Sequence, residues 1–352
     1  MPVTAPPRSS TRAATLKGLR DQALITEARD RARRRRRHYA AAVTVAVVIG
    51  TAAVLAMRAD NGGARSAAAA QPLAHTAPSS TRSMIVFTVW NPNSTALIYR
   101  INADGSGLHR LLSWKTLWRV GHWGSWPALS PGGRHVAFQA GTLRRPGIEV
   151  ANVDGTHVHW VNRGAHPTWS PDGTHIAYSA RPEGIYVERP DGTDWRLVSL
   201  RGNLPSWSPD GTRLAYVCIP DQHRGRAHLC VMNADGTGRH RMLSPASYAT
   251  PAWSPDGTKI AYLRGWPRVH VNVINADGTN PRQLAPRVSY KNADCGPAWS
   301  PSGKQIAFSP TMPQIDGGPG GIYLMDADGG NLVHLKGTAG TTCGITWKRT
   351  PA

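Results

Sequence analysis

Several signatures of catalytic chemistry are missing from this sequence of 352 residues. No G-x-S-x-G motif occurs, and enzymes of the α/β-hydrolase class place their nucleophile on that turn. The cysteines number only four, none of them in C-x-x-C spacing, and the 14 histidines show no matched spacing, so the usual metal-binding patterns are missing. No phosphate-cradling loop is present either. We therefore predict no catalytic residue, no metal and no cofactor, in a protein that is not an enzyme.

Acidic residues are also scarce, because 21 Asp and Glu stand against 41 Lys and Arg and give a formal net charge of +20. Residues 1–38 hold eleven Lys and Arg against three Asp and Glu, a net of +8, which leaves +12 for residues 39–352. A basic surface favours acidic partners, here a protein or an anionic envelope polymer. The alternative is an arginine-rich genome that raises the charge everywhere. We expect no nucleic-acid partner.

The N-terminal part of the chain contains one long uncharged run, YAAAVTVAVVIGTAAVLAM, at residues 39–57. Nineteen helical residues nearly span a hydrocarbon core of roughly 30 Å. Five arginines at 33–37 precede the run, and such clusters stay in the cytoplasm. We expect a basic cytoplasmic segment (1–38), a transmembrane helix (39–57) that binds the membrane, a flexible linker (58–82) and an extracytoplasmic remainder. The alternative is a signal peptide cleaved near residues 67–70, with a secreted product.

Phenylalanine is rare, with three residues against thirteen tryptophans, and several tryptophans recur in one phrase. The phrase reads PTWSPDGTHIAYS at residues 167–179 and returns at 205–217, 251–263 and 297–309, with a divergent copy at 127–139. A second phrase, such as LCVMNADGTG at residues 229–238, occurs six times between residues 98 and 331. In both phrases an apolar run leads into a Gly-containing turn, which is typical of a β-hairpin.

Two hairpins per repeat predict a four-stranded sheet, and the repeat length is about that of one β-propeller blade. The last first-phrase copy, CGITWKRTPA at 343–352, stops after one strand, and MIVFTVW at 84–90 matches its missing second strand. We therefore predict an all-β, six-bladed propeller over residues 83–348, closed by one blade from residues 84–113 plus 343–348 and followed by a tail at 349–352. The side chains expected to fill the spaces between blades are Leu129, Trp169, Trp207, Trp253, Trp299 and Trp347.

The WSPDGxxIAY phrase and the ADGT turn resemble the WD40-like PD40 repeats of the TolB C-terminal domain. The resemblance covers residues 84–348. It implies a TolB-like six-bladed propeller that binds a partner in the cell envelope. TolB itself is a soluble periplasmic protein with an additional N-terminal domain, in whose place this chain has the expected anchor, so TolB's own partners are not transferred. The arrangement looks like the membrane-anchored PD40 proteins of high-GC Gram-positive bacteria.

All four cysteines fall in the expected exterior domain, where disulfides persist. Cys218 ends the second strand of one blade and Cys230 opens the third strand, so the two are expected within disulfide reach. Cys295 and Cys343 each lie four residues before the Trp position of their blades. Equivalent positions in neighbouring blades approach at the channel, which makes Cys295–Cys343 the second expected bridge.

The longest insertions between strands are the candidates for recognition, because loops carry binding residues more often than the scaffold does. The preferred hypothesis is a non-enzymatic extracytoplasmic binding or scaffolding propeller. The alternatives are an envelope hydrolase or lyase with a site in the propeller channel, and a transmembrane sensor that signals through residues 1–38. Loop packing against the blades is the alternative use of the same aromatics. The candidate binding face consists of Trp114, Lys115, Trp118, Arg119, Trp123, Trp126 and His166.

Overall fold

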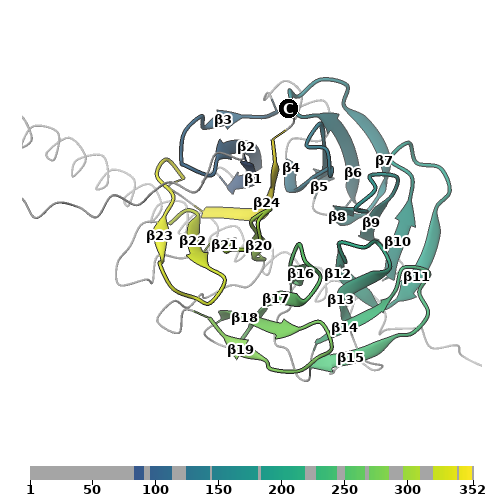
Figure 1. Cartoon of the computed structure of the whole chain (residues 1–352). Coiled ribbons are helices and arrows are strands. Elements are labelled where there is room, and N and C mark those ends of the chain that lie inside the picture. Colours follow the sequence, from purple (N-terminus) through teal and green to yellow (C-terminus); the bar gives the residue numbers. More distant parts are fainter. Residues whose placement is uncertain are drawn as a thin grey trace, which may run out of the picture. The chain divides into compact units, whose positions relative to one another are not determined.

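The structure is a computed structural model of the whole chain. It describes residues 83–90, 96–112, 124–142, 145–180, 184–218, 227–243, 250–265, 269–284, 296–309, 320–338 and 341–350. Within these ranges the chain forms six four-stranded antiparallel sheets arranged as the blades of a ring (Figure 1). The predicted all-β, six-bladed propeller is confirmed.

The strands of each blade follow one another from the centre of the ring to its rim (Figure 1). The innermost strands are β4 (Gly124–Leu129), β8 (Ala165–Trp169), β12 (Gly202–Trp207), β16 (Ala252–Trp253), β20 (Ala298–Trp299) and β24 (Thr341–Arg349). The second strands are β5 (His135–Thr142), β9 (Ile176–Ala180), β13 (Arg213–Cys218), β17 (Lys259–Arg264), β21 (Gln305–Phe308) and β1 (Ser83–Trp90).

The two outer positions of each blade are also filled in all six sheets. The third strands are β6 (Arg145–Asn152), β10 (Gly184–Glu188), β14 (His228–Asn233), β18 (His270–Asn275), β22 (Tyr323–Asp326) and β2 (Ala96–Asn102). The outermost strands are β7 (His159–Arg163), β11 (Arg196–Leu200), β15 (His240–Leu243), β19 (Arg282–Gln283), β23 (Val333–His334) and β3 (His109–Arg110).

One blade joins the two ends of the propeller. Strand β24 pairs with β1 from Ser83 opposite Arg349 to Trp90 opposite Thr341, and β2 and β3 complete this closing blade. Strand β24 is therefore the innermost strand of a sheet whose other three strands come from the start of the propeller. Closure of this kind leaves no open edge between the first and the last blade.

The apolar core is divided into six clusters, each formed by two neighbouring blades. Trp169, for example, packs on Ile148 and Val150 of the preceding blade, and its indole N–H donates to the Ala128 carbonyl at 3.0 Å. A four-stranded blade has two apolar faces and can bury both only between neighbours. The repeated Trp position thus lies in the seam between blades, and the same holds for Leu129, Trp207, Trp253, Trp299 and Trp347.

The two ends of the ring differ in the connections that they carry. In five blades the chain joins the first strand to the second, and in all six it joins the third to the fourth; these turns lie at the same end because the strands are antiparallel. We call this end the turn face. It holds five inner turns near residues 133, 173, 211, 257 and 303 and six outer turns near residues 105, 155, 192, 236, 278 and 329, each with a glycine at positive φ. The opposite end, with the remaining connections, is the loop face.

The expected membrane anchor at residues 39–57 lies outside the described residues. In the part of the chain that the structure describes, no helix has the length and apolar character needed to cross a bilayer. The anchor, the cytoplasmic segment and the linker therefore stay predictions.

Candidate functional site

A cavity of about 500 Å³ lies between the six inner strands, and every blade contributes to its wall. In five of the six blades the lining repeats a residue before a proline, the proline itself, the Trp position, and a second proline in the inner turn. Proline and tryptophan are the commonest residues of the wall, and hydroxyl and cationic side chains share it with them, so the wall is of mixed polarity. The volume falls within the usual range of ligand pockets, about 300–1,000 Å³.

The loop-face end of this cavity has an unusual backbone. Trp126, His166 and Leu204 each precede a proline, and each has a left-handed backbone with φ between 52° and 57°. A residue before proline is normally extended, and left-handed φ is uncommon for residues other than glycine. At each position the strand pairing contains a β-bulge. Bulges re-aim side chains and are frequent beside functional sites, so these three residues mark the candidate mouth of the cavity.

Contacts between blades hold this mouth together. The rings of Trp126 and His166 meet edge to face with 4.6 Å between centroids. Burial lowers the pKa of His166 to about 4, and a hydrogen bond with the Asn203 side chain opposes that shift in part. The amide of Leu204 donates to Ser179 Oγ at 3.0 Å. His166 is therefore a neutral packing and hydrogen-bonding group at physiological pH, which does not suit proton transfer at neutral pH.

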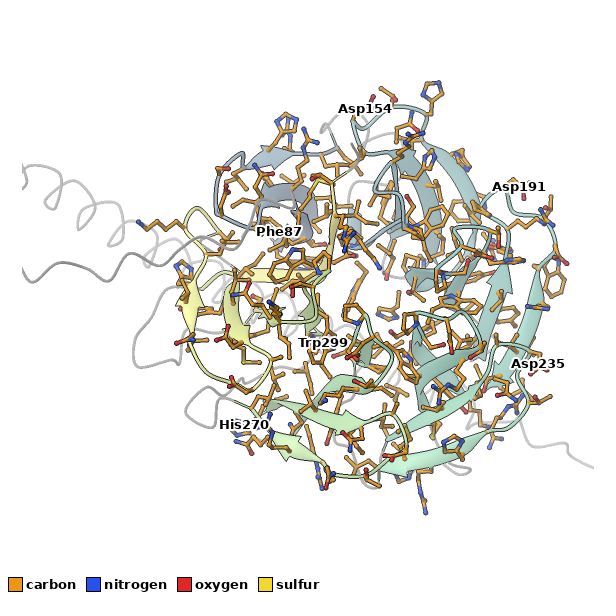
Figure 2. The ribbon with its side chains drawn as sticks, in the orientation of Figure 1. Phe87, Asp154, Asp191, Asp235, His270 and Trp299 are labelled. Atoms are coloured by element: carbon orange, nitrogen blue, oxygen red, sulfur yellow. A yellow bond between two sulfur atoms is a disulfide. The ribbon has the colours of Figure 1, made fainter. Side chains whose placement is uncertain are left out.

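The described carboxylates are segregated to one end of the propeller. Two of the thirteen, Glu149 and Glu188, are buried within blades. The other eleven belong to the turn face, and Figure 2 shows three of them, Asp154, Asp191 and Asp235, at the rim of the ring. The full set is Asp104, Asp154, Asp172, Asp191, Asp194, Asp210, Asp235, Asp256, Asp277, Asp326 and Asp328.

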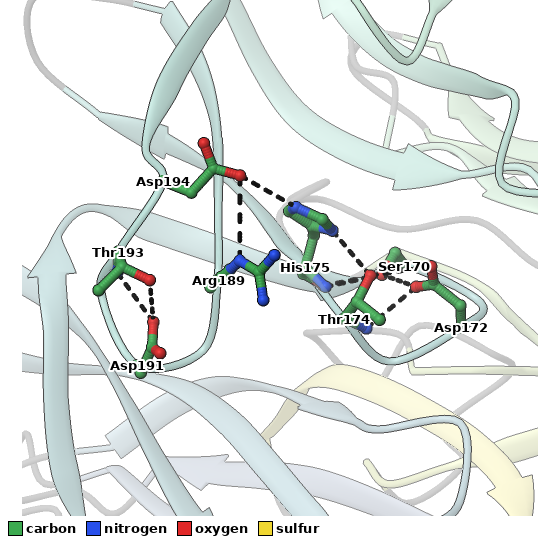
Figure 3. Close-up of polar contacts among 8 residues, drawn as sticks. All are labelled: Ser170, Asp172, Thr174, His175, Arg189, Asp191, Thr193 and Asp194. Atoms are coloured by element: carbon green, nitrogen blue, oxygen red, sulfur yellow. Dashed lines mark hydrogen bonds and ion pairs between the residues drawn. The ribbon is translucent and has the colours of Figure 1, made fainter.

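The turn carboxylates are engaged in local hydrogen bonds (Figure 3). Asp172 accepts from Ser170 Oγ at 2.5 Å and from the Thr174 amide at 3.0 Å. These bonds, the one from Ser170 first, lower the pKa of Asp172 to about 2. Asp191 accepts from the Thr193 amide at 2.9 Å in the same manner. Repeated turn formation accounts for these acids, and among the described residues no cluster of His, Cys, Asp or Glu could hold a metal ion.

In the β8 blade, an ion-pair group joins the inner turn to the outer turn. Asp194 Oδ2 lies 3.7 Å from His175 Nε2 and 4.0 Å from Arg189 Nε (Figure 3). The Asp194 and Arg189 side chains are 64% and 56% exposed. An exposed pair of this kind contributes about 0–1 kcal/mol, so we assign it a local structural role.

The charged side chains that the structure describes at the loop face are cationic. Arg163 ends β7, Arg201 joins β11 to β12, and Arg264 ends β17. Arg163 and Arg201 are exposed, and each lies three residues before a mouth residue, His166 or Leu204. No carboxylate among the described residues accompanies them at this end. The mouth of the cavity thus opens on a surface whose described charges are cationic.

The sequence-predicted site residues are only partly covered by the described ranges. Trp126 and His166 lie together at the mouth. The other five lie outside the described residues and stay predictions: Trp114, Lys115, Trp118, Arg119 and Trp123. Leu204 was missed, and so was the basic pair Lys348 and Arg349, which also lines the cavity. A comparison of the residues around the six Trp positions could have found that pair, because five blades have Ser-Pro there.

One of the two expected disulfides is present. Cys218 and Cys230 are joined across β13 and β14, with their Cα atoms 5.9 Å apart. This separation is typical of disulfides. Cys295 and the side chain of Cys343 lie outside what the structure describes, so the Cys295–Cys343 bridge stays a prediction.

Because the Glu149 carboxyl is buried, we expect the free energy of unfolding to depend on pH. Desolvation raises the pKa of Glu149 from 4.5 to about 7, and its Oε2 is buried without a hydrogen-bond partner. Because the folded pKa is above the unfolded one, the wild-type free energy of unfolding falls as pH rises from about 4.5 to 7. We expect Glu149→Gln to be more stable than wild type at pH 8 by about 3 kcal/mol, and to lose this advantage near pH 4.

Urea unfolding at pH 4, 6 and 8 measures this difference. Asp191→Asn is the control, with an expected effect of opposite sign. Hydrogen bonds from Thr193 lower the pKa of Asp191, so removing this carboxylate should lower the free energy of unfolding at a pH above the pKa of Asp191 in the unfolded chain. A Glu149→Gln advantage of equal size at pH 4 and pH 8 would show that the carboxyl does not titrate in the folded state as inferred.

Comparisons with known proteins agree with this architecture. Residues 211–350 match the family model of PD40, the TolB beta propeller domain. The "Protein TolB homolog" of Chlorobium luteolum is 33% identical over 123 residues, which cover 33% of this chain and 26% of that protein. The match therefore spans about a quarter of the relative's length.

Two solved structures share the fold. TolB from Acinetobacter baumannii superposes with a TM-score of 0.63 at 18% identity, over 75% of this chain and 66% of that chain. The putative TolB from Agrobacterium tumefaciens gives a TM-score of 0.52 at 20% identity, over 77% of this chain and 99% of that chain. The family match covers the later blades, and the same phrases and seams recur in the earlier ones. Residues 83–350 thus form a six-bladed β-propeller, and its later part, residues 211–350, matches the PD40 model.

Proposed function

We propose that this protein is a non-enzymatic binding module whose loop face recognises an acidic partner, either an acidic protein surface or an anionic envelope polymer. The observation that carries the proposal is the distribution of the described charges, since the described residues of the loop face include Arg163, Arg201 and Arg264 and no carboxylate. The eleven aspartates of the turn face are accompanied by cations such as Arg213, Lys259 and Arg282. The described charges of the loop face are cationic, and they attract an acidic partner there. Complementary charge steers association and suppresses wrong orientations.

The mouth of the cavity supplies the specific part of the proposed interface. The Trp126 ring contacts the ring of His166, and the connection that leads into the His166 strand carries Arg163. Trp and Arg are enriched among the residues that carry most of the binding energy of protein interfaces. The described polar groups at the mouth pack or donate hydrogen bonds, and His166 is neutral. This arrangement supports binding better than it supports hydrolysis or elimination.

The proposal includes an extracytoplasmic location, with residues 39–57 as the membrane anchor. The support is the uncharged run behind five arginines and the Cys218–Cys230 disulfide. Structural disulfides form and persist in oxidising compartments and are rare in the cytosol. A propeller outside the cell membrane would meet acidic partners of the envelope.

Site-specific photo-crosslinking of the full-length chain in intact cells tests the proposal. We expect a photoreactive residue at position 163, on the loop face, to capture a partner, and one at position 193, in an outer turn, to capture none. Treatment of the captured product with protease or with polymer-degrading enzymes separates a protein from a polymer. The charge is tested by Arg201→Glu, which should reduce capture several-fold, whereas Arg282→Glu at the turn face should not. Equal capture from both faces would refute the assignment.

A further inference from the structure

The turn-face end of the cavity contains an irregularity in the repeat. In five blades the Trp position is followed by Ser-Pro, and the serine begins the inner turn, as Ser170 does with Asp172. In the closing blade Trp347 is followed by Lys348 and Arg349, and β24 makes no inner turn. Both basic residues line the cavity. Two cations therefore stand where the other blades have a buried serine and a proline.

No carboxylate among the described residues neutralises this pair. The cavity lining contains no Asp or Glu, and neither Lys348 nor Arg349 has an ion pair or side-chain hydrogen bond within the part of the chain that the structure describes. Lys348 and Arg349 are both exposed. The surrounding walls nevertheless desolvate Lys348 and lower the pKa of its ammonium. Two adjacent cations without a carboxylate partner create a local positive potential, which a bound anion would neutralise.

The inner turns next to the closing blade carry no carboxylate that could neutralise Lys348 and Arg349. Asp172, Asp210 and Asp256 belong to the three blades of β8, β12 and β16. The blades on either side of the closing blade instead have Gly132 and Ser302 at that position. The three turns with an aspartate also carry His175, Arg213 or Lys259, whereas the two turns beside the closing blade carry Arg134 or Lys304 and no carboxylate.

We propose that Lys348 and Arg349 form an anion-binding site inside the cavity, for the carboxylate or phosphate group of a slender ligand whose apolar part lies against the Pro and Trp walls. Arginine offers a planar fork of donors that matches both oxyanions, and lysine adds a compact point charge. The site is separate from the partner surface proposed for the loop face. It predicts that the propeller holds a small anionic ligand or the anionic end of a chain.

Isothermal titration of the purified full-length chain with benzoate and with phenyl phosphate tests the site, with benzyl alcohol as the uncharged control. We expect saturable binding of at least one anion and none of the alcohol. Lys348→Ser restores the residue that the other blades have, so it should fold, and we expect it to weaken binding at least about tenfold. Lys304→Ser removes an exposed cation of the β20 blade outside the cavity lining and should leave binding unchanged.

A second readout keeps the proposal testable if affinities are low. The Lys348 ammonium, followed by NMR of the amine nitrogen, should show a pKa that rises when benzoate or phenyl phosphate is added. The relative affinity of the two probes tells a carboxylate site from a phosphate site. Equal binding by wild type and Lys348→Ser, or no effect of either anion on the wild-type ammonium, overturns the proposal. Lys348→Ser should leave photo-capture at position 163 intact, so either proposal can fail without the other.

Discussion

Replacing Trp347 by alanine is expected to lower the free energy of unfolding by about 3–5 kcal/mol, the usual cost of removing a buried tryptophan. Trp347 is 5% exposed and packs with Ile85 and Phe87 in the seam between the closing blade and its neighbour. Its indole N–H donates to Ser83 Oγ at 3.1 Å. The substitution therefore leaves a cavity in the apolar cluster beside β24, the strand that closes the ring.

Thermal unfolding and amide hydrogen exchange measure the effect. We expect the midpoint to fall by roughly 10 °C and the amides of β1 and β24 to lose protection before those of other blades. Trp195→Ala is the matched control, because Trp195 is 63% exposed and its loss should change stability by less than about 1 kcal/mol. A Trp347→Ala protein within 1 kcal/mol of wild type, with β24 still protected, would mean that closure does not depend on this side chain.

The six-bladed ring could be predicted because its determinants are local and repeated. A turn such as that at Gly173 needs positive φ, and a seam residue such as Trp169 needs a large apolar side chain. Each requirement recurs at a fixed place in the phrase, so six copies specify one architecture. The closing strand could also be predicted, because the last phrase, at residues 343–352, lacks a second strand and residues 84–90 match that missing strand.

The mouth of the cavity could not be predicted in the same manner. A residue before proline is expected to be extended, so nothing local announces the left-handed backbone of Trp126, His166 and Leu204. That conformation results from a bulge between two strands and from contacts across blades, such as the Trp126–His166 ring pair. Both are tertiary effects that a single sequence does not encode in any short motif.

Buried acids illustrate a second limit of pattern reading. Alternation along β6 places Ile148 and Val150 on one face and Glu149 on the other. In a sheet with one wet face, this pattern would put Glu149 in solvent. In a propeller both faces of a blade meet a neighbour, so Glu149 is buried and its pKa is raised. Alternation thus predicts correctly which residues of β6 share a face, but it does not predict that Glu149 is buried.

Replacing Gly236 by alanine is expected to destabilise the propeller by about 3 kcal/mol or more. Gly236 has φ +88, and a Cβ built there would lie 2.2 Å from the Val198 carbonyl oxygen of the preceding blade. A left-handed conformation alone costs an L-residue about 1–2 kcal/mol, and here the obstacle is backbone that cannot rotate away. Arg239 fixes the same contact, because its guanidinium donates to the Val198 and Gly236 carbonyls at 2.8 Å.

Gly132→Ala is the matched control, since a Cβ at Gly132 meets nothing within 4 Å and its φ lies outside the left-handed region. We expect that variant to be neutral, or more stable by about 0.4–1 kcal/mol because alanine restricts the unfolded chain. Urea unfolding of both proteins gives the comparison. If the two variants differ by less than about 1 kcal/mol, the outer turn at Gly236 does not pack on the neighbouring blade as closely as described. The blades would then be held together by their apolar seams alone, and the outer Asp-Gly turns would serve only to reverse the chain.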